Sequence, residues 1–274
     1  MTNFSTADHL AEAIQAYSKP KDERAGEIVR SAIKHLYAFA EEVALTREEW
    51  FAGIRFLTAT GHMCDEQRQE FILLSDTLGL SMLIEMINQN AADGTTDPTV
   101  FGPFHVANAP VKEMGDTIVI DDDPGAVITF RGTVRDLGGN PLSGAEIDVW
   151  QTASNGMYDV QDPNQTPMNM RGRFTTGVDG TYAFRTVRPV AYPIPADGPV
   201  GGMLDATGRH NWRPAHTHVV VSVAGYKTII THLFDRDSDY LDSDTVFGVR
   251  ESLVVDMSGD VVAYDFVLEP GPTD

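Results

Sequence analysis

Two histidines separated by one residue stand at the head of a valine-rich run, RPAHTHVVV (213–221). Side chains alternate between the two faces of a β-strand, so His216 and His218 face the same side if this run is a strand. Two imidazoles on one face can form half of a metal site. The same spacing is also typical of a polar strand end with hydrogen-bonded histidines, and the pair alone leaves both interpretations open.

Other metal-binding patterns are missing around this pair. No acidic residue occurs in VVVSVAGYKTIITH (219–232), where a cupin would usually supply a glutamate. The pair is not near the N-terminus in a βα repeat, as it would be in a barrel-type metal-dependent hydrolase. The sequence has no His-Glu-x-x-His and, with Cys64 as its only cysteine, no Cys-x-x-Cys.

Two tyrosines occupy unusual positions upstream of the histidines. Tyr158 lies in a polar, glycine-containing segment just after the run DVWQ (148–151). Tyr192 directly precedes a proline in RPVAYPIP (188–195), which favours a rigid, extended segment. A tyrosine in such a position is ordinarily an amphipathic packing residue, and neither one by itself indicates a metal site.

Taken together and in this order, several segments resemble the intradiol ring-cleaving dioxygenases: GPFHVANAP (102–110), DVWQ…GMYD (148–159), RPVAYPIP (188–195) and WRPAHTHVVVSVAGY (212–226). The resemblance covers nearly the whole chain. It implies a mononuclear, non-haem Fe(III) bound by Tyr158, Tyr192, His216 and His218. Fe(III) is a hard cation that suits anionic phenolate oxygens, and two phenolates with a hydroxide would balance its charge beside two neutral imidazoles.

The same resemblance implies roles for residues around the iron. A catechol would bind through both oxygens and lose both protons, and Tyr192 would leave the metal and act as the proton acceptor. O2 would then attack the ring, which opens between its two hydroxyl-bearing carbons to give a dicarboxylate. Arg213 would stabilise negative charge on the ring, with a structural salt bridge as the alternative. His232 stands where catechol-cleaving relatives have an assisting glutamine, and a histidine can also donate a hydrogen bond.

The substrate is suggested by the segment FILLSD (71–76), which places Leu73 and Asp76 on one helix face. Simple catechol cleavers tend to have an apolar residue or a proline at the position of Asp76. A carboxylate in an apolar pocket needs a polar partner, and a third substrate hydroxyl would be one. The segment TVFGPFHV (99–106) also resembles the hydroxyquinol-cleaving branch of the family.

We therefore expect 1,2,4-trihydroxybenzene (hydroxyquinol) as the substrate and 3-hydroxy-cis,cis-muconate, which tautomerises to maleylacetate, as the product. The alternative for Asp76 is an exposed helix residue, and the apolar pocket residues could equally be core. The expected pocket consists of Leu73, Asp76, Val100, Pro103, Phe104, Ile194, Pro195 and Arg213.

Three other functions fit part of the pattern. The first is the cleavage of catechol or chlorocatechol by the same chemistry. The second is a non-catalytic β-sandwich binding module that has kept the fold. The third is a zinc hydrolase built on the two histidines, which tyrosine ligands make a poor fit.

The composition excludes several classes of partner. The formal net charge of −20 argues against binding to nucleic acid or to anionic membrane surfaces, because both require basic patches. Any anionic substrate would need a local positive site. A single cysteine rules out an intrachain disulfide and fits a reducing compartment. No signal peptide and no membrane-spanning run is evident, so we expect a cytoplasmic protein without membrane insertion.

The elements that must position these residues change in character along the chain. Residues 22–45 show helical spacing, Thr46 and Glu49 stand in capping-box positions, and residues 66–88 form a nearly all-apolar helical segment after Asp65. Residues 88–110 are rich in Asn, Asp, Gly and Pro and indicate a loop. After residue 115, short β-rich runs alternate with turns, which is typical of a β-sandwich.

These patterns predict an α+β protein with an N-terminal helical domain and linker (1–95) and a catalytic antiparallel β-sandwich domain (96–274). The apolar helical segment is compatible with a homodimer formed through the N-terminal helices, and equally with burial inside one subunit. The family resemblance adds that a lipid is sometimes bound between such helices.

Overall fold

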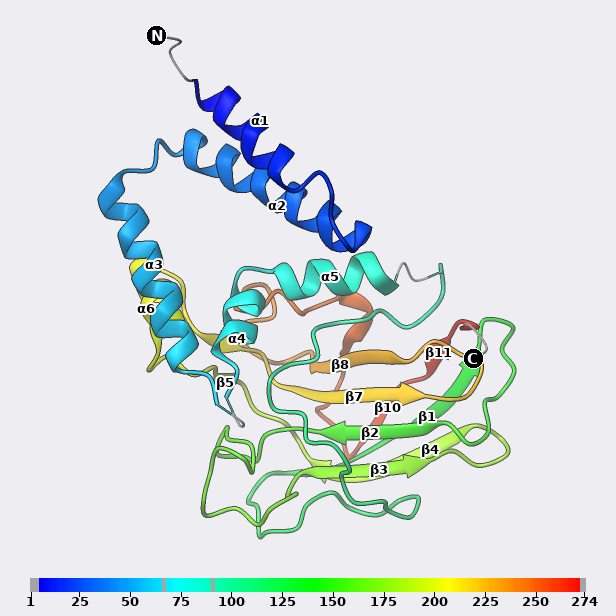
Figure 1. The fold of residues 1–274 in the computed structure, drawn as a ribbon. Helices are drawn as coiled ribbons and strands as arrows, with labels where there is room; N and C mark the ends of the chain where they lie inside the picture. Colours follow the sequence, from blue (N-terminus) through cyan, green and yellow to red (C-terminus); the bar gives the residue numbers. More distant parts are fainter. Residues whose placement is uncertain (1–4, 66–67, 90–91, 272–274) are drawn as a thin grey trace. The chain divides into compact units, whose positions relative to one another are not determined.

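The computed structural model describes residues 5–65, 68–89 and 92–271. Helices precede two β-sheets, so the expected α+β class is confirmed (Figure 1). The chain divides into two compact units, residues 1–59 and residues 60–274. This division differs from the expected one at residue 95, and the functional domain boundary at that point stays a prediction. No helix among the described residues is long and apolar enough to cross a membrane.

The first unit contains helices α1 (Thr6–Ala16), α2 (Glu23–Glu42) and most of α3 (Arg47–His62). Side chains cap the start of each helix. Ser5 and Asp8 form a capping box on α1, and the Asp22 carboxylate accepts the Ala25 amide at 2.9 Å. The capping box expected at Thr46 is confirmed, since Glu49 accepts hydrogen bonds from the Thr46 amide and hydroxyl.

The apolar segment at 66–88 is not one helix, and this expectation is wrong in its detail. The structure has α4 (Glu70–Thr77) and α5 (Leu80–Gln89), separated by Gly79 at φ +76°. This left-handed conformation ends α4 and is readily adopted only by glycine. The first residues of the expected helix, 66 and 67, lie outside the described residues.

The β-strands form two main sheets and a short pair. One sheet contains β1 (Val127–Asp136), β4 (Thr181–Val187), β10 (Val261–Ala263) and β11 (Phe266–Leu268). The second has the order β3 (Arg171–Thr175), β2 (Glu146–Trp150), β7 (His216–Ser222), β8 (Ile229–Asp235) and β9 (Val254–Val255). A separate pair joins β5 (Tyr192–Pro193) to β6 (Trp212–Arg213). The remaining elements are α6 (Pro199–Ala206) and a short 3₁₀ turn (Glu251–Leu253).

The sheets are mainly antiparallel, as expected, but their edges are mixed. β10 and β11 run parallel to β1, and β9 runs parallel to β8. These three strands come from the C-terminal part of the chain: a long connection leads from β8 to β9, and β10 and β11 then follow closely and pair with successive parts of β1.

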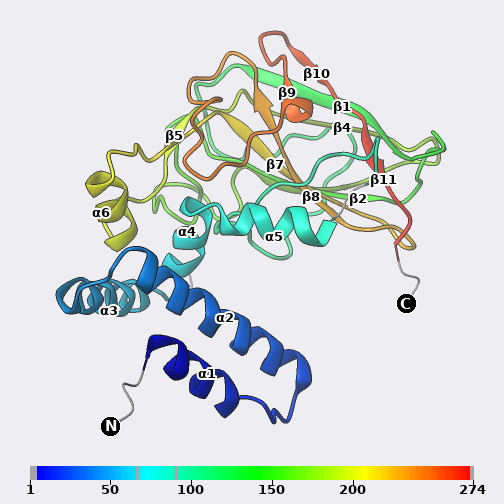
Figure 2. The ribbon, with the colours of Figure 1, turned by 90° about the horizontal axis from the view of Figure 1, so that it is seen from above.

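The core lies between the two sheets. Strand alternation directs Ile128 and Phe130 from β1 and Val219 and Val221 from β7 into one buried cluster. The other face of the five-stranded sheet is covered in part by helices, and Figure 2 shows α4 and α5 on one side of β7 and β8, with β1, β4 and β10 on the other. That second face carries the functional residues.

Candidate active site

A row of buried side chains crosses the outer face of the five-stranded sheet. Trp150 on β2 is paired with His218 on β7, and His218 is paired with His232 on β8. Directly opposed residues in an antiparallel sheet point to the same side, so these rings lie next to one another. The rings of Trp150 and His218 stack at 4.7 Å, and those of His218 and His232 meet edge to face at 4.0 Å. The expected alternation along this strand is confirmed.

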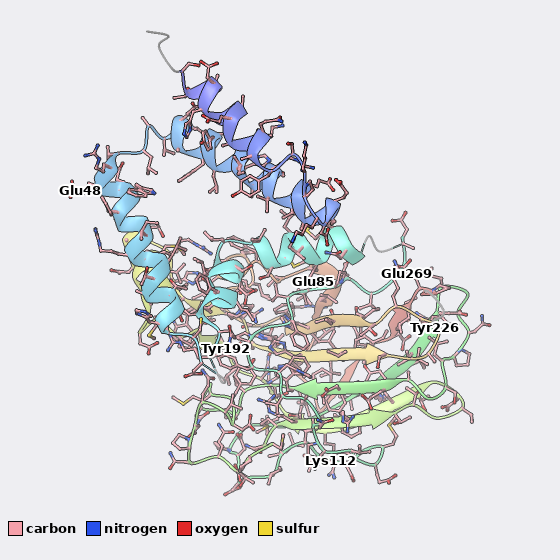
Figure 3. All side chains as sticks on the ribbon, in the orientation of Figure 1. Glu48, Glu85, Lys112, Tyr192, Tyr226 and Glu269 are labelled. Atoms are coloured by element: carbon pink, nitrogen blue, oxygen red, sulfur yellow. The ribbon has the colours of Figure 1, made fainter. Side chains whose placement is uncertain are left out.

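Two neighbouring segments bring further polar groups to this row. His216 begins β7, and its Nδ1–H donates to the Pro214 carbonyl at 2.7 Å, which leaves Nε2 facing His218 at 3.2 Å. The β5–β6 pair places Tyr192 directly opposite Arg213. In Figure 3, Tyr192 lies close to α4, and it shares an apolar cluster with Leu73 of that helix.

Tyr158 approaches the same point from the loop after β2. Its hydroxyl lies 3.0 Å from the hydroxyl of Tyr192 and 2.9 Å from Nε2 of His218. Both tyrosines are fully buried, and burial raises the pKa of each phenol above its ordinary value. Such phenols ionise near neutral pH only against a strong positive charge such as a bound metal ion.

The four atoms expected to bind iron therefore converge. The measured separations between neighbouring donor atoms are 2.9, 3.0 and 3.2 Å. Donors bound at about 2.0–2.1 Å and at roughly right angles on one ion would be about 3 Å apart, so the residues fit a single metal ion. Two phenol oxygens and two imidazole nitrogens are the hard and intermediate donors that suit iron.

The histidines are in the right protonation state for this role. Burial, followed by the Arg213 guanidinium, holds the pKa of His216 well below its usual value, and burial likewise lowers the pKa of His218 and His232. All three imidazoles are therefore neutral at pH 7, as metal ligands must be. Among the described residues, they also form a group whose ligand atoms all lie within 4.8 Å of one another.

A buried ion pair supplies a fixed positive charge next to the cluster. Arg213 is 3% exposed, and its guanidinium donates to both carboxylate oxygens of Asp244 at 3.1 and 3.3 Å. Burial alone lowers the pKa of Arg213, but Asp244, Tyr192 and Tyr158 together raise it above its ordinary value, so the charge persists. Nη1 of Arg213 also donates to Nε2 of His216 at 3.0 Å, a bond that metal binding at this nitrogen would replace.

His232 contributes a buried nitrogen without a partner. Its Nδ1 lies 3.4 Å from Nη2 of Arg213, whereas its Nε2 makes no hydrogen bond with any described residue. An unpaired buried polar atom is costly, which is a physical reason to expect a ligand atom there. His232 thus lies beside His216 and His218, and its assisting role stays a prediction.

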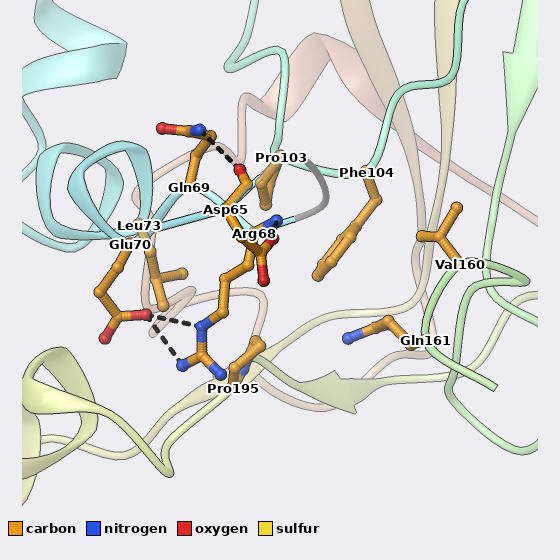
Figure 4. Close-up of a pocket in the computed structure, with 10 residues that line it drawn as sticks. All are labelled: Asp65, Arg68, Gln69, Glu70, Leu73, Pro103, Phe104, Val160, Gln161 and Pro195. Carbon is orange, nitrogen blue, oxygen red and sulfur yellow. Dashed lines mark hydrogen bonds and ion pairs between the residues drawn. The ribbon is translucent and has the colours of Figure 1, made fainter. Parts of the chain in front are cut away.

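A cavity shown in Figure 4 has Leu73 and Phe104 in its wall, and both residues pack in the apolar cluster of Tyr158 and Tyr192. Four of the expected pocket residues line it, namely Leu73, Pro103, Phe104 and Pro195. The Phe104 ring stacks on Tyr158 at 4.7 Å, which connects the cavity wall to the donor cluster. The rim also carries polar groups that the sequence did not suggest, including Arg68, whose guanidinium donates to the buried Glu70 carboxylate at 2.9 and 3.0 Å.

The other expected pocket residues lie elsewhere in the site region. Ile194 belongs to the apolar cluster of Tyr158 and Tyr192, whereas Val100 packs in a separate cluster with Met82 and Val246. Asp76 does not line the cavity. It is 3% exposed, so the alternative of an exposed helix residue is excluded.

Asp76 lies in the electrostatic field of the buried ion pair. Burial raises the pKa of its carboxyl to about 6, while a hydrogen bond from Ser81 and the charge of Arg213 oppose the rise and Asp244 adds to it. Neighbouring groups replace only part of the hydration that this carboxylate loses on burial, so a hydrogen bond donated by a ligand would stabilise it.

Several residues that hold the site together could not be recognised from their sequence context. Trp150 could have been found from strand pairing, because it ends a strand that must lie beside the histidines. Asp244 sits in the polar run DSDTVFG, which looks like an ordinary turn. Gly102 has φ +77°, and a Cβ there would lie 3.0 Å from Cε1 of His218, so this glycine permits the close approach of the chain to the ring.

The fold and the site define a class: a β-sandwich protein with a buried place for one metal ion, held by tyrosines and histidines. Comparison with known proteins narrows this class. Residues 22–96 match the family model described as "Catechol dioxygenase N terminus", and residues 100–270 match the one described as "Dioxygenase".

Individual relatives agree over nearly the whole chain. The chain is 49% identical to 6-chlorohydroxyquinol 1,2-dioxygenase of Cupriavidus pinatubonensis, covering 90% of this chain and 91% of that protein. It is also 49% identical to hydroxyquinol 1,2-dioxygenase of a Rhizobium species, covering 92% and 86%. The structure of hydroxyquinol 1,2-dioxygenase from Pseudomonas putida is similar with a TM-score of 0.90 at 46% identity, covering 97% and 98%. The structure of catechol 1,2-dioxygenase from an Acinetobacter species is similar with a TM-score of 0.83 at 27% identity, covering 97% of this chain and 93% of that one.

The chain belongs to the intradiol ring-cleaving dioxygenase family, whose members use non-haem iron. It is an enzyme, and the family expected from the motifs is confirmed. The non-catalytic module and the zinc hydrolase have no support from these relatives.

The raised pKa of Asp76 predicts a pH-dependent stability change in Asp76→Asn. The folded pKa of about 6 exceeds the ordinary value of 3.8 for an aspartate, so ionisation destabilises the native state. This penalty is absent below pH 4, grows between pH 4 and 6, and is complete above pH 6. Asp76→Asn should therefore raise the free energy of unfolding at pH 7–8 by up to about 3 kcal/mol, with no gain at pH 4. Denaturant unfolding of both proteins across this pH range is the measurement, and an equal difference at pH 4 and pH 8 would contradict the assignment.

The close approach at Gly102 predicts a specific effect of Gly102→Ala. The added Cβ would push the His218 ring, so iron affinity should fall by about tenfold or more. Gly115→Ala is the matched control, because Gly115 has a similar φ of +85° but nothing within 4 Å of an added Cβ. Both variants should lose roughly 1–2 kcal/mol of stability from backbone strain. Iron titration separates the two effects, and equal iron affinity in both variants would refute the role of Gly102.

Proposed function

We propose that this enzyme cleaves hydroxyquinol with O2 between its two adjacent hydroxyl-bearing carbons, giving 3-hydroxy-cis,cis-muconate and, after tautomerisation, maleylacetate. The observation that carries the proposal is the buried Asp76 carboxylate beside Arg213, in a chain whose similar relatives include named hydroxyquinol 1,2-dioxygenases. A third ring hydroxyl can donate to this carboxylate, whereas catechol has no hydroxyl to offer.

The proposed ligands are Tyr158, Tyr192, His216 and His218, and the proposed metal is a single Fe(III). When bound, it supplies a positive centre that holds the deprotonated diol and makes the ring reactive toward O2. The convergence of these four donor atoms within 2.9–3.2 Å of their neighbours supports this assignment.

The surrounding residues have distinct proposed tasks. Tyr192 accepts a proton from the substrate, and burial, which raises the pKa of its phenol, helps it to keep that proton. Arg213 stabilises negative charge on the ring as a fixed cation. His232 offers its unpaired Nε2 to the substrate or to O2.

The pocket walls orient the ring and exclude water. Leu73, Pro103, Phe104 and Pro195 line the cavity beside the donor cluster, and Ile194 packs behind the tyrosines. Val100 packs with Met82 and Val246 in a separate apolar cluster, so it would affect how the substrate fits only indirectly. The apolar side of this cavity would exclude water from the ring and so strengthen the electrostatic interactions that the ring makes.

The first test is the visible absorption spectrum of the purified protein, recorded before and after anaerobic addition of hydroxyquinol and, separately, of catechol. Phenolate bound to Fe(III) should give a broad charge-transfer band that hydroxyquinol shifts at low concentration. Asp76→Asn should reduce kcat/KM for hydroxyquinol by about 10–100-fold, since a hydrogen bond to a charged group contributes about 1.5–3 kcal/mol, and should leave catechol turnover nearly unchanged. Product analysis identifies the ring-opened acid.

Two outcomes would contradict parts of this proposal. A protein that stays colourless after reconstitution with iron has no ferric tyrosinate site. If the band shifts only with catechol, or if Asp76→Asn loses both activities equally, the iron site is still supported but hydroxyquinol is not the preferred substrate. Catechol and chlorocatechol would then be the remaining candidate substrates.

We further propose a homodimer formed through the N-terminal helices, with a lipid as a further candidate ligand there. The first unit has an apolar groove between its helices, and several large apolar side chains along it are about half exposed in the single chain: Leu36, Phe39, Trp50, Ile54 and Leu57. Monomeric proteins rarely expose so large an apolar patch without a partner.

The dimer has a direct test. Leu36→Glu should convert the protein from dimer to monomer in light scattering, because it places a charge in the apolar groove. Val178→Glu is the control, since Val178 is 89% exposed and lies in the second unit. A wild-type protein that is already monomeric would contradict the proposal, and mass spectrometry of an organic extract would show whether lipid is bound.

The small aromatic substrate and O2 are the reaction partners in this proposal. A cytoplasmic location is also proposed, since the only cysteine, Cys64, suits a reducing compartment. Fractionation of the source cells would test it.

A further inference from the structure

Arg171 is a buried cation that the proposed chemistry does not use. It begins β3 directly opposite Trp150, so it extends the row of Trp150, His218 and His232 across the sheet. Its side chain is 1% exposed. Burying a guanidinium costs several kcal/mol unless its hydrogen bonds are satisfied, so its contacts show what holds it there.

The contacts of Arg171 surround Tyr158. Its Nε donates to Oδ1 of Asp159, the residue after Tyr158, at 2.7 Å. Its Nη1 donates to the carbonyl oxygen of Phe104 at 2.8 Å, and the Phe104 ring stacks on Tyr158. The guanidinium carbon itself lies 6.0 Å from the centre of the Tyr158 ring. One side chain therefore binds the carboxylate of the residue after Tyr158 and the backbone carbonyl of Phe104, whose ring packs against Tyr158.

The carboxylate partner is itself well fixed. The Asp159 side chain is 5% exposed, and its Oδ2 accepts the Met168 amide at 2.8 Å. If Arg171 and Asp159 served only to neutralise each other, Arg171 would need neither its hydrogen bond to the Phe104 carbonyl nor its position near the Tyr158 ring. The planar fork of arginine can reach two separate acceptors at once, which a lysine ammonium on a flexible stem does less well.

We propose that Arg171 is a positioning residue for Tyr158, which holds the phenol at the metal and places a fixed positive charge behind it. The inference rests on the proposed iron site, in which Tyr158 is a ligand. Through the Phe104 carbonyl, the same arginine also fixes one wall of the cavity in Figure 4. Residues that orient metal ligands in this way usually affect metal affinity or activity by about 10–100-fold.

The chain offers a matched control on the same strand. Arg173 lies two residues further along β3, on the same face, and its contacts are of the same kind. Its Nε donates to the Ala109 carbonyl at 2.8 Å, and its Nη1 lies 3.3 Å from Glu146. No ring contact to a tyrosine is recorded for Arg173 within the described chain.

The experiment compares Arg171→Met, Arg171→Lys and Arg173→Met with the wild-type protein. The readouts are the iron dissociation constant, the position of the tyrosinate charge-transfer band, and kcat and KM for hydroxyquinol. Arg171→Met should bind iron about 10–100-fold more weakly and shift the band, and Arg171→Lys should recover part of both effects. Arg173→Met should match the wild type in iron affinity and band position.

Equal iron affinity and band position in Arg171→Met and Arg173→Met would overturn the inference, and the proposed iron site would still stand. Absence of the band in the wild-type protein would overturn both. If Arg171→Met does not fold, Arg171→Lys and Asp159→Asn decide, because each weakens the contact to Tyr158 without leaving an empty cavity. A wild-type band and iron affinity in both of these variants would refute the role of Arg171.

Discussion

The register of the five-stranded sheet is the constraint on which the site depends. It places Arg171, Trp150, His218 and His232 in one row on one face, while the alternate residues of the same strands fill the core. A slip of one residue in any of these strands would exchange core and site faces, because side chains alternate with a period of two. The apolar core therefore fixes the positions of the polar cluster: the free energy of burying Val219 and Val221 on one side also orients His218 on the other.

The electrostatics of the site follow from this burial. Three histidines and two phenols are removed from water near the guanidinium groups of Arg213 and Arg171, and burial drives each toward its neutral form. Asp244 keeps Arg213 charged and holds it in one orientation, with two backbone amides supporting the carboxylate. In a chain with a formal charge of −20, the guanidinium of Arg213 places a positive group at the site, where an electron-rich ring requires one.

The sequence predicted the fold class from local pattern and the family from its motifs, whereas the set of iron ligands was implied by the family resemblance and stays a prediction. Alternation revealed the shared face of His216 and His218, and the turn-rich segments revealed a β-sandwich. It did not predict the break at Gly79, since an apolar run reads the same whether or not the helix continues through it. Nor could it indicate Asp244, whose partner Arg213 lies 31 residues away, or Arg171, whose partners Asp159 and Phe104 lie 12 and 67 residues away, because these residues become neighbours only through tertiary folding.

The break at Gly79 also matters for substrate choice. Because α4 ends there, the chain can turn so that Ser81, at the start of α5, donates a hydrogen bond to Ser75 of α4 and lowers the pKa of the nearby Asp76 carboxyl. A continuous helix would carry residue 81 a turn and a half beyond residue 76, on a different face. The buried carboxylate is thus held by the helix break, beside an arginine that is itself held by the β5–β6 pair and by Asp244. Specificity for a third hydroxyl would then arise where the helical segment meets the sandwich, and the ring-opening chemistry from the five-stranded sheet together with the loop of Tyr158 and the β5–β6 pair.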